Sequence, residues 1–380
     1  MRTAIILFSM LNIISMVQGQ DRKGKDYHLV IGSYTGKENS DGIHVYRFNS
    51  ESGKVNSTPL VAEIVNASYL AISKDKRNVY AVSESSGDKA SINAFSFNPV
   101  SGALTFLNSV PSEGDHPCYV AVDDKKKFVF VGNYSGGNLL SIPLNADGSL
   151  RSDVQNIKHE GSSINKERQE RPHVHSVVLS VDNRYLLVQD LGTDKINSYK
   201  VDVTKPQALT PAEPPFTSVK RGSGPRHLTF HPTGKYAYVI LEMEAAVTAF
   251  DYKNGVLKEK QTISMLKPDF KGNSAGAADI HVSPDGKFLY ASNRGDANEI
   301  VIYSIDKNGK LTTVGHQSIL GKTPRNFALD PAGNFLLSGN QGSNEVVIFK
   351  RDQKTGLLTP TGEKIVVDKP VCLKFVAVAE

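Results

Sequence analysis

The sequence predicts an all-β fold, a seven-bladed β-propeller, from two repeating patterns and from the way the two ends of the chain complement each other. The composition agrees with that class. The 380 residues include no tryptophan, 31 glycines and 18 prolines, and the turn-forming residues are spread along the whole length. Such a chain is typical of many short strands joined by turns.

The first repeat is a basic or polar residue followed by an apolar strand. It recurs at intervals of about fifty residues and begins at Arg77, Lys127, Arg184, Lys235, Lys287 and Asn334. The second repeat is Gly-x-Leu or Gly-x-Val after a turn, at Gly53, Gly102, Gly148, Gly255, Gly309 and Gly356, with Gln207-Ala208-Leu209 in the vacant seventh place. Each unit is therefore predicted to be one blade, a small antiparallel sheet.

The two ends of the chain are predicted to share the last blade. Residues 31–36, IGSYTG, match residues 131–136, VGNYSG, which form the second strand of a blade, but no first strand precedes them. Residues 369–375, KPVCLKF, have the pattern of a first strand without a following one. Pairing these segments closes the ring and leaves no unpaired edge there.

The first 19 residues are predicted to be a secretory signal. Arg2 precedes an apolar run over residues 4–17, and Gln18-Gly19 precedes a charged segment that begins at Asp21. The run is short for a membrane span and its regions follow the order of a signal peptide. We expect cleavage near Gly19, one propeller domain over residues 20–380, and a periplasmic or secreted protein with no membrane attachment after cleavage. An uncleaved anchor is the alternative.

Charge and cysteine content point to no nucleic-acid partner and no disulfide. The net charge of +5 is dispersed, and the basic run at 125–127 falls in a turn between apolar segments, where solvent covers it. Cys118 and Cys372 occupy similar places in two units, so we expect free thiols, although export would permit a bridge. We expect a monomer.

Polar side chains gather where the innermost strands begin. The middle of such a strand is covered by neighbouring blades and must be apolar, so charge is tolerated only at its ends, near the axis. The strand beginnings hold His116, His173, His175, Arg226, Asp279, His281, Arg325 and Asn326, and the ends of the adjacent strands hold Glu84, Asp190, Glu242, Arg294 and Gln341. These residues are predicted to ring one mouth of the central channel.

Four segments carry a family resemblance: GSGPRH at 222–227, ADIHVSPDG at 278–286, SNRG at 292–295 and TPRNF at 323–327. Together they resemble the seven-bladed propeller lactonase family, which includes bacterial 6-phosphogluconolactonases and fungal carboxy-muconate cyclases. The resemblance covers essentially the whole chain after the signal. It implies a catalytic set of Arg226, Glu242, Arg294 and one histidine, either His173 or His175.

Lactone hydrolysis needs a base for water, donors for the oxyanion and an acid for the leaving alkoxide. We expect Glu242 or a histidine, with its pKa shifted toward neutrality by the confined site, to act as the base. Arg226, Arg294 and Arg325 are expected to hold the oxyanion and any anionic group of the substrate. The further substrate-binding candidates are His116, Asp279, His281, Asn326 and Gln341. The resemblance implies a sugar acid lactone as substrate, with 6-phosphogluconolactone as the leading candidate, and we expect neither cofactor nor metal.

Each candidate group has an alternative interpretation. Arg226 and Glu242 could instead form an ion pair that only stabilises the fold. Cys118 near His116 could instead form a catalytic pair, with the thiol as nucleophile and the imidazole as its base. A metal site is the alternative for His173, His175, Asp279 and His281.

Two rival functions also stay open at this stage. One is a cycloisomerase that closes an unsaturated diacid to a lactone, using the same arginines. The other is an exported propeller that binds a ligand or partner without catalysis, because a fold does not imply a function. Serine-hydrolase chemistry is not indicated, since no Gly-x-Ser-x-Gly segment stands in the strand–turn–helix context of a nucleophile elbow.

Overall fold

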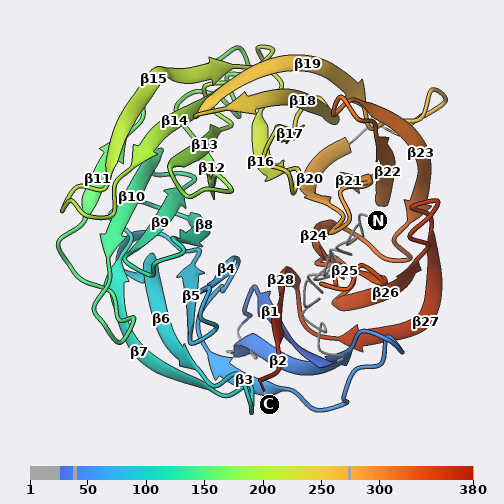
Figure 1. Cartoon of the computed structure of the whole chain (residues 1–380), viewed down its shortest axis with the longest axis horizontal. Coiled ribbons are helices and arrows are strands. Elements are labelled where there is room, and N and C mark those ends of the chain that lie inside the picture. The colour runs from blue at the N-terminus through green and yellow to red at the C-terminus, as the bar shows by residue number, and fades with distance from the viewer. Residues whose placement is uncertain (1–25, 37–40, 273–274, 380) are drawn as a thin grey trace, which may run out of the picture.

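The computed structural model describes residues 26–36, 41–272 and 275–379. Over these residues the chain forms a ring of seven four-stranded antiparallel sheets (Figure 1). Outside the strands the described chain consists of turns, connections and one short 3₁₀ helix, η1 (Gly87–Lys89). The ring confirms the predicted seven-bladed propeller.

Six blades are each built from four strands that follow one another in the chain. The first three are β4 (Leu70–Ile72), β5 (Asn78–Ser83), β6 (Ser91–Phe97), β7 (Leu104–Pro111); β8 (Pro117–Val122), β9 (Phe128–Asn133), β10 (Asn138–Pro143), β11 (Gln155–Lys158); and β12 (Val174–Leu179), β13 (Tyr185–Asp190), β14 (Lys195–Val201), β15 (Leu209–Ser218). The next three are β16 (Pro225–Phe230), β17 (Tyr236–Leu241), β18 (Ala246–Lys253), β19 (Val256–Ser264); β20 (Ala275–Val282), β21 (Phe288–Gly295), β22 (Glu299–Ile305), β23 (Leu311–Ser318); and β24 (Pro324–Leu329), β25 (Phe335–Asn340), β26 (Glu345–Arg351), β27 (Leu358–Val366).

The seventh blade joins the two ends of the described chain. Its strand order is β28-β1-β2-β3, with β28 at Pro370–Ala377, β1 at Asp26–Ser33, β2 at Asp41–Asn49 and β3 at Leu60–Glu63. β1 and β28 pair antiparallel from Tyr27 opposite Ala377 to Ser33 opposite Pro370. The predicted closure of the ring is therefore confirmed.

The core lies between the blades. Every residue of β5, β9 and β25 is buried, because each blade is covered on both faces by its neighbours. Between the blades of β16–β19 and β20–β23, for example, Tyr238 and Ile240 belong to one apolar cluster with Leu289 and Ala291. Polar side chains are consequently confined to the strand ends and the turns.

The two sequence repeats meet across each of several blade interfaces. The basic or polar residue of the first repeat immediately precedes β5, β9, β13, β17, β21 and β25. The glycine of the second lies between the third and fourth strands of the next blade. At Gly309, φ is +76°, and an added Cβ would lie 2.5 Å from Cγ of Tyr236 in the preceding blade. Only glycine gives both the left-handed turn and this close approach.

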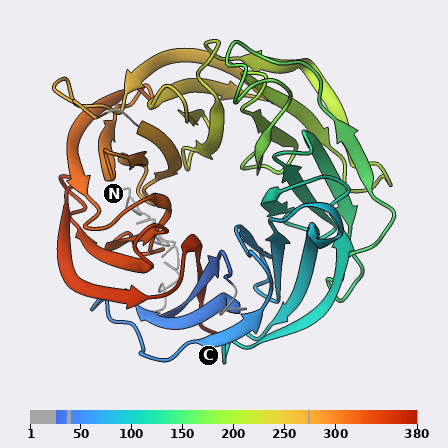
Figure 2. The ribbon, with the colours of Figure 1, turned by 180° about the vertical axis from the view of Figure 1, so that it is seen from behind.

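The innermost strands circle the axis, and the outer strands form the rim, as both faces of the ring show (Figures 1 and 2). These innermost strands are β4, β8, β12, β16, β20, β24 and β28, and each contacts the next around the ring. Their N-terminal ends meet at one mouth of the axis. Among the described residues no helix is long and apolar enough to cross a membrane.

Candidate active site

A cavity of about 320 Å³ lies at the mouth where the innermost strands begin. The repeat places two positions of each blade there, the beginning of the first strand and the end of the second, so residues far apart in sequence converge. The cavity is lined by Glu84, Cys118, Tyr134, Arg168, His175, Glu242, Arg294 and Arg325. Three guanidinium groups, two carboxyl groups and an imidazole thus share one small space.

Glu242 is the centre of the charge cluster. Nη2 of Arg168 donates to its Oε1 (2.8 Å), whereas Nε of Arg226 lies 2.9 Å and Nη2 of Arg294 lies 3.3 Å from its Oε2. Burial alone would raise the pKa of Glu242, but Arg294, Arg226 and Arg168 together lower it to about 2. Glu242 is therefore a carboxylate at neutral pH, and the expected shift of its pKa toward neutrality is wrong.

Arg226 lies behind Glu242 and does not line the cavity. Its side chain is 1% exposed. Nη1 donates to the carbonyl oxygen of Ala278 and to Nε2 of His227 (3.1 Å), and Nδ1 of His227 lies 2.8 Å from Oδ1 of Asp279. Because Nε2 of His227 accepts, its Nδ1 carries the proton toward Asp279. Arg226 and Glu242 thus form the buried ion pair of the alternative interpretation. Arg226 acts on the cavity only through its contact with Glu242.

The structure separates the two candidate histidines. His175 lines the cavity, with Nε2 3.9 Å from Oε2 of Glu242. Burial lowers the pKa of His175 well below its usual range, and Arg226 lowers it further, so the imidazole is neutral at pH 7. His173 instead stacks on Tyr134 and bonds through Nδ1 to the carbonyl oxygen of that residue (3.0 Å), outside the cavity lining. His175 is therefore the histidine available to a bound molecule.

Arg325 and Glu84 form another part of the cavity wall. Its guanidinium stacks over the ring of Tyr34 at 5.4 Å, and Nη2 lies 3.6 Å from Oε2 of Glu84. The hydroxyl of Tyr34 also donates to Oε2 of Glu84 (2.7 Å). The wall is thus a second arginine–glutamate pair, looser than the one at Glu242.

The other predicted binding residues lie away from the cavity lining. Asp279 is buried below it, where its Oδ2 contacts Nε2 of His281 (2.8 Å) and accepts from the amide of Asn326. His116 bonds to Oγ of Ser135 (2.9 Å). Gln341 is not among the lining residues either. Of the predicted binding set, only Arg325 lines this cavity.

The metal and thiol alternatives gain no support from the geometry. Among the described residues, no group of three or more His, Cys, Asp or Glu side chains is arranged to hold a metal. Cys118 and Cys372 are both buried free thiols. Burial raises the pKa of Cys118, so the sulfur is protonated at neutral pH and is a poor nucleophile.

Sequence reasoning missed Arg168 and Tyr134. Arg168 belongs to the connection between β11 and β12, which does not follow the repeat, and its Nη2 also donates to Oη of Tyr134 (3.2 Å). The only signal in the sequence was the longer interval between Lys127 and Arg184, which indicates an insertion but not which of its residues turns inward.

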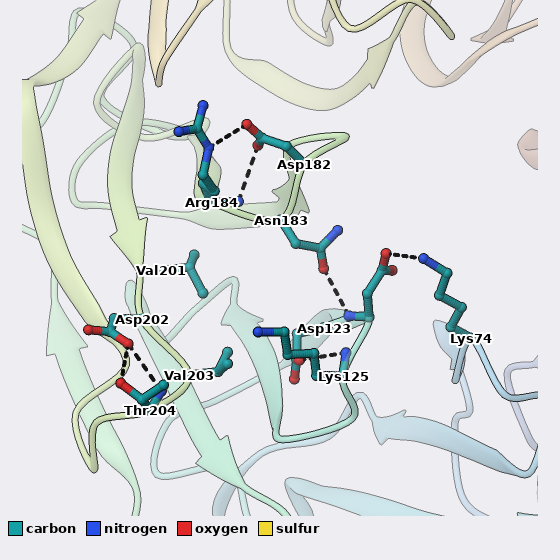
Figure 3. A pocket seen from close by; sticks show the side chains of 11 residues that line it. Lys74, Asp123, Lys125, Asp182, Asn183, Arg184, Val201, Asp202, Val203 and Thr204 are labelled. Atoms are coloured by element: carbon teal, nitrogen blue, oxygen red, sulfur yellow. Dashed lines mark hydrogen bonds and ion pairs between the residues drawn. The ribbon is translucent and has the colours of Figure 1, made fainter.

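A larger hollow, of about 590 Å³, lies among turns at the opposite end of the strands (Figure 3). Several of its carboxylates are bound by neighbouring side chains. Nε of Arg184 contacts Asp182 (2.6 Å), and Thr204 donates to Asp202 (2.6 Å). The hollow contains no histidine and a single arginine, unlike the axial cavity.

A family model described as "Lactonase, 7-bladed beta-propeller" matches residues 28–375. The chain belongs to the seven-bladed β-propeller lactonase family. The resemblance seen in the sequence is thereby confirmed. The matched range begins within β1 and ends within β28, so the family pattern includes the blade that joins the two ends of the chain.

Relatives and solved structures extend this match. A 6-phosphogluconolactonase of Formosa agariphila is 40% identical over 305 residues, covering 80% of this chain and 86% of the relative. One of Bacillus subtilis is 37% identical over 303 residues, covering 79% and 84%. The structure of the periplasmic gluconolactonase PpgL of Pseudomonas aeruginosa is 38% identical, with a TM-score of 0.88 over 93% of this chain and 100% of that one. A protein from Bacteroides fragilis is 42% identical, with a TM-score of 0.88 over 93% and 98%.

Proposed function

We propose that this protein hydrolyses the lactone of a sugar acid in the axial cavity. One observation carries the proposal: a neutral imidazole, His175, shares a cavity of about 320 Å³ with three guanidinium groups and the ionised Glu242. That set provides a base and a positive field for a developing oxyanion. The family and the names of the relatives support the same reaction class.

In the proposed mechanism His175 is the general base. A neutral imidazole at the cavity wall takes a proton from water as the water attacks the lactone carbonyl. The imidazolium that results is stabilised by the Glu242 carboxylate, 3.9 Å away. The same proton then passes to the ring oxygen when the C–O bond breaks, which leaves the hydroxy acid and a neutral His175.

Arg294 and Arg325 are proposed to stabilise the oxyanion. Both line the cavity, and a guanidinium stays charged throughout the reaction. Arg294 is already oriented, because its Nε donates to the carbonyl oxygen of Gly276 (3.0 Å) and its Nη2 to that of Ala277 (3.3 Å). Such preorganised donors need no rearrangement as charge develops. Arg226 has a positioning role, since it holds Glu242 from behind.

We propose a six-membered aldonolactone as substrate, with 6-phosphogluconolactone and its unphosphorylated form as the two candidates. The relatives include both a 6-phosphogluconolactonase and a gluconolactonase. Neither a lactonising cycloisomerase nor a purely binding propeller is favoured by these relatives. No cofactor enters the proposed mechanism.

The proposal includes export of a monomer to the periplasm or medium, where it would meet a small lactone without a nucleic-acid or membrane partner. Residues 1–19, the predicted signal, lie outside the described residues. The likeness to a periplasmic gluconolactonase supports export. N-terminal sequencing of the mature protein should begin at about residue 20 by the small-residue cleavage rule, and finding Met1 instead would refute cleavage.

The activity is tested with five assays on the purified mature chain. Glucono-δ-lactone, its 6-phosphate and a carboxy-muconate are supplied in turn, and the lactone assays are repeated with a chelator. We expect acid release from at least one lactone, unchanged by the chelator, and no lactonisation of the muconate. Turnover of the muconate alone would favour the cycloisomerase, and no turnover of any substrate would favour a binding protein.

A further inference from the structure

Residues 159–173, the connection between β11 and β12, depart from the repeat, and we call them the arm. The corresponding connections before β8 and β24 span only residues 112–116 and 319–323. The longer arm brings Arg168 over the cavity, where the guanidinium reaches both Glu242 and Tyr134. The blade of β12–β15 is therefore preceded by a longer segment than the blades of β8–β11 and β24–β27, which fold without one.

Asp190, at the end of β13, fastens both ends of the arm. Its Oδ2 lies 2.9 Å from Nδ1 of His159, the first residue of the arm. Its Oδ1 accepts from the backbone N–H of His173, the last residue (2.8 Å). Asp190 is fully buried. A single carboxylate thus fixes the distance between the two ends.

Comparison of the blades shows that this fastening is specialised. Asparagine ends the corresponding strand in two other blades, and its amide donates to the first backbone carbonyl after the outer strand of the preceding blade. Asn133 donates in this way to Ser112 (2.8 Å) and Asn340 to Ile319 (3.2 Å). In the blade that carries the arm, a carboxylate–imidazole pair replaces this neutral bond. A charge-assisted bond is stronger and suits a longer segment.

The arm is also held along its length. Gln169 is fully buried, and its Nε2 donates to the carbonyl oxygen of Leu191 (2.9 Å). Oδ1 of Asn165 accepts from the backbone N–H of Arg168 (3.0 Å). Ile164 packs on Gly222 in the next blade, so closely that an added Cβ there would lie 2.7 Å from Cδ1 of Ile164. Arg168 is therefore presented by an ordered segment.

Arg168 differs from the other arginines of the cavity in its exposure. Its side chain is 45% exposed, against 17% for Arg294 and 18% for Arg325. Its guanidinium donates to the side chains of Tyr134 and Glu242, whereas that of Arg294 also donates to two backbone carbonyl oxygens. It stands at the rim, where the end of a substrate remote from the reacting ester would emerge.

We propose that Arg168 is a specificity-determining residue that binds the oxygen-rich end of the lactone, and that Asp190 and His159 are positioning residues that hold it there through the arm. The proposal rests on the lactonase activity proposed above. The oxygen-rich end is either a hydroxyl or a phosphate, and guanidinium binds both, the phosphate more strongly.

The test uses four variants of the mature chain: Arg168→Gln, His159→Ala, the double variant, and Gln155→Ala as a control. Gln155 lies on β11 just before the arm and makes two hydrogen bonds with Leu209 of the next blade, so its loss weakens packing without releasing the arm. KM and kcat are measured on glucono-δ-lactone and its 6-phosphate. Amide hydrogen exchange of residues 159–173 and melting temperatures are measured in parallel.

We expect Arg168→Gln to raise KM by about 10- to 100-fold for the substrate whose distal group it binds, with a smaller change in kcat. His159→Ala should raise KM by about tenfold and speed exchange in the arm. The double variant should be no worse than Arg168→Gln, because both changes act through one guanidinium. Gln155→Ala should lower the melting temperature and leave KM and arm exchange as in the wild type.

Independent, additive effects of Arg168→Gln and His159→Ala would overturn the proposal, as would unchanged KM or unchanged arm exchange in His159→Ala. A larger KM effect on the phosphorylated lactone identifies phosphate as the distal group, and an equal effect on both identifies hydroxyls. If the wild type hydrolyses neither lactone, the proposed function fails, and the exchange measurement still decides whether Asp190 and His159 hold the arm.

Discussion

At the scale of single residues, Glu242 carries the charge balance of the site. Its carboxylate faces Arg226, which is almost wholly buried, as well as Arg168 and Arg294. Substituting Glu242→Gln keeps the shape but removes the countercharge of a buried guanidinium. A broken buried pair of this kind costs about 3–5 kcal/mol. We therefore expect Glu242→Gln to lower both the melting temperature and the turnover.

A surface glutamate beside the site provides the control for this substitution. Glu170 is 41% exposed and pairs with the exposed Arg171 and with the buried His173. A pair with so exposed a carboxylate contributes about 0–1 kcal/mol. Glu170→Gln should consequently melt within a degree or two of the wild type, about the shift that so small a change produces. Equal melting of Glu242→Gln and the wild type, by differential scanning calorimetry, would show that the buried pair contributes little.

The residues of the site were only partly predictable from the sequence. Arg294, Arg325, Glu242 and His175 lie at repeated blade positions, so the repeat alone brought them to the axis. Depth along the axis was not predictable, because it depends on side-chain direction at each strand end. For that reason Arg226 was expected in the cavity but lies behind Glu242. Arg168 was missed because its segment is longer than the corresponding connections before β8 and β24 and does not follow the repeat.

At the scale of strands and turns, the recurrent glycine is expected to be indispensable for blade packing. Gly309 has φ +76° and touches Tyr236, whereas Gly362 has φ +85° with nothing within 4 Å of an added Cβ. Both Gly→Ala changes carry the cost of a left-handed alanine, about 1 kcal/mol. Gly309→Ala should cost a further 1–3 kcal/mol or so, from overpacking.

Urea unfolding of the two alanine variants measures this difference. The expected order of stability is wild type, then Gly362→Ala, then Gly309→Ala. Equal stability of the two variants would mean that the blade interface yields to the methyl group, and that the glycine is retained for the turn alone.

The strands themselves were largely predictable, since the period, the turn residues and the apolar runs repeat seven times and support one another. The six predicted strand starts each lie one residue before the observed strand. Connections carry no such repetition. The arm is stabilised by individual bonds, such as those of Asp190 and Gln169, that no periodic pattern encodes.

At the scale of the whole molecule, the buried polar axis predicts sensitivity to acid. Burial and Arg226 lower the pKa of His227 to about 3, despite the opposing effect of Asp279, and the pKa of His175 is lowered as well. The pKa of Glu242 is about 2. The unfolded chain binds protons at the ordinary pKa values of these groups, so between about pH 6.5 and 3 it takes up protons that the folded chain does not.

The stability contributed by these groups is therefore complete above about pH 6.5 and is lost as the pH falls, by up to about 1.4 kcal/mol per pH unit for each group. We expect the melting temperature to fall steadily from pH 7 to pH 4. The slope should be smaller in His227→Asn, which lacks one of the groups. A melting temperature that is constant over this range would show that the folded protein does not keep His175 and His227 neutral and Glu242 ionised.

The central claim, that the axial cavity is a lactonase site with His175 as its base, is tested most directly by the pH dependence of kcat/KM on glucono-δ-lactone. The wild type and His175→Gln are compared, with melting temperatures measured on the same samples. Because the pKa of His175 is lowered, the wild-type profile should stay level from pH 7 through 6.5 and fall only at more acidic pH. His175→Gln should lose about 100-fold or more at an unchanged melting temperature. Wild-type activity per folded molecule in His175→Gln would contradict the account.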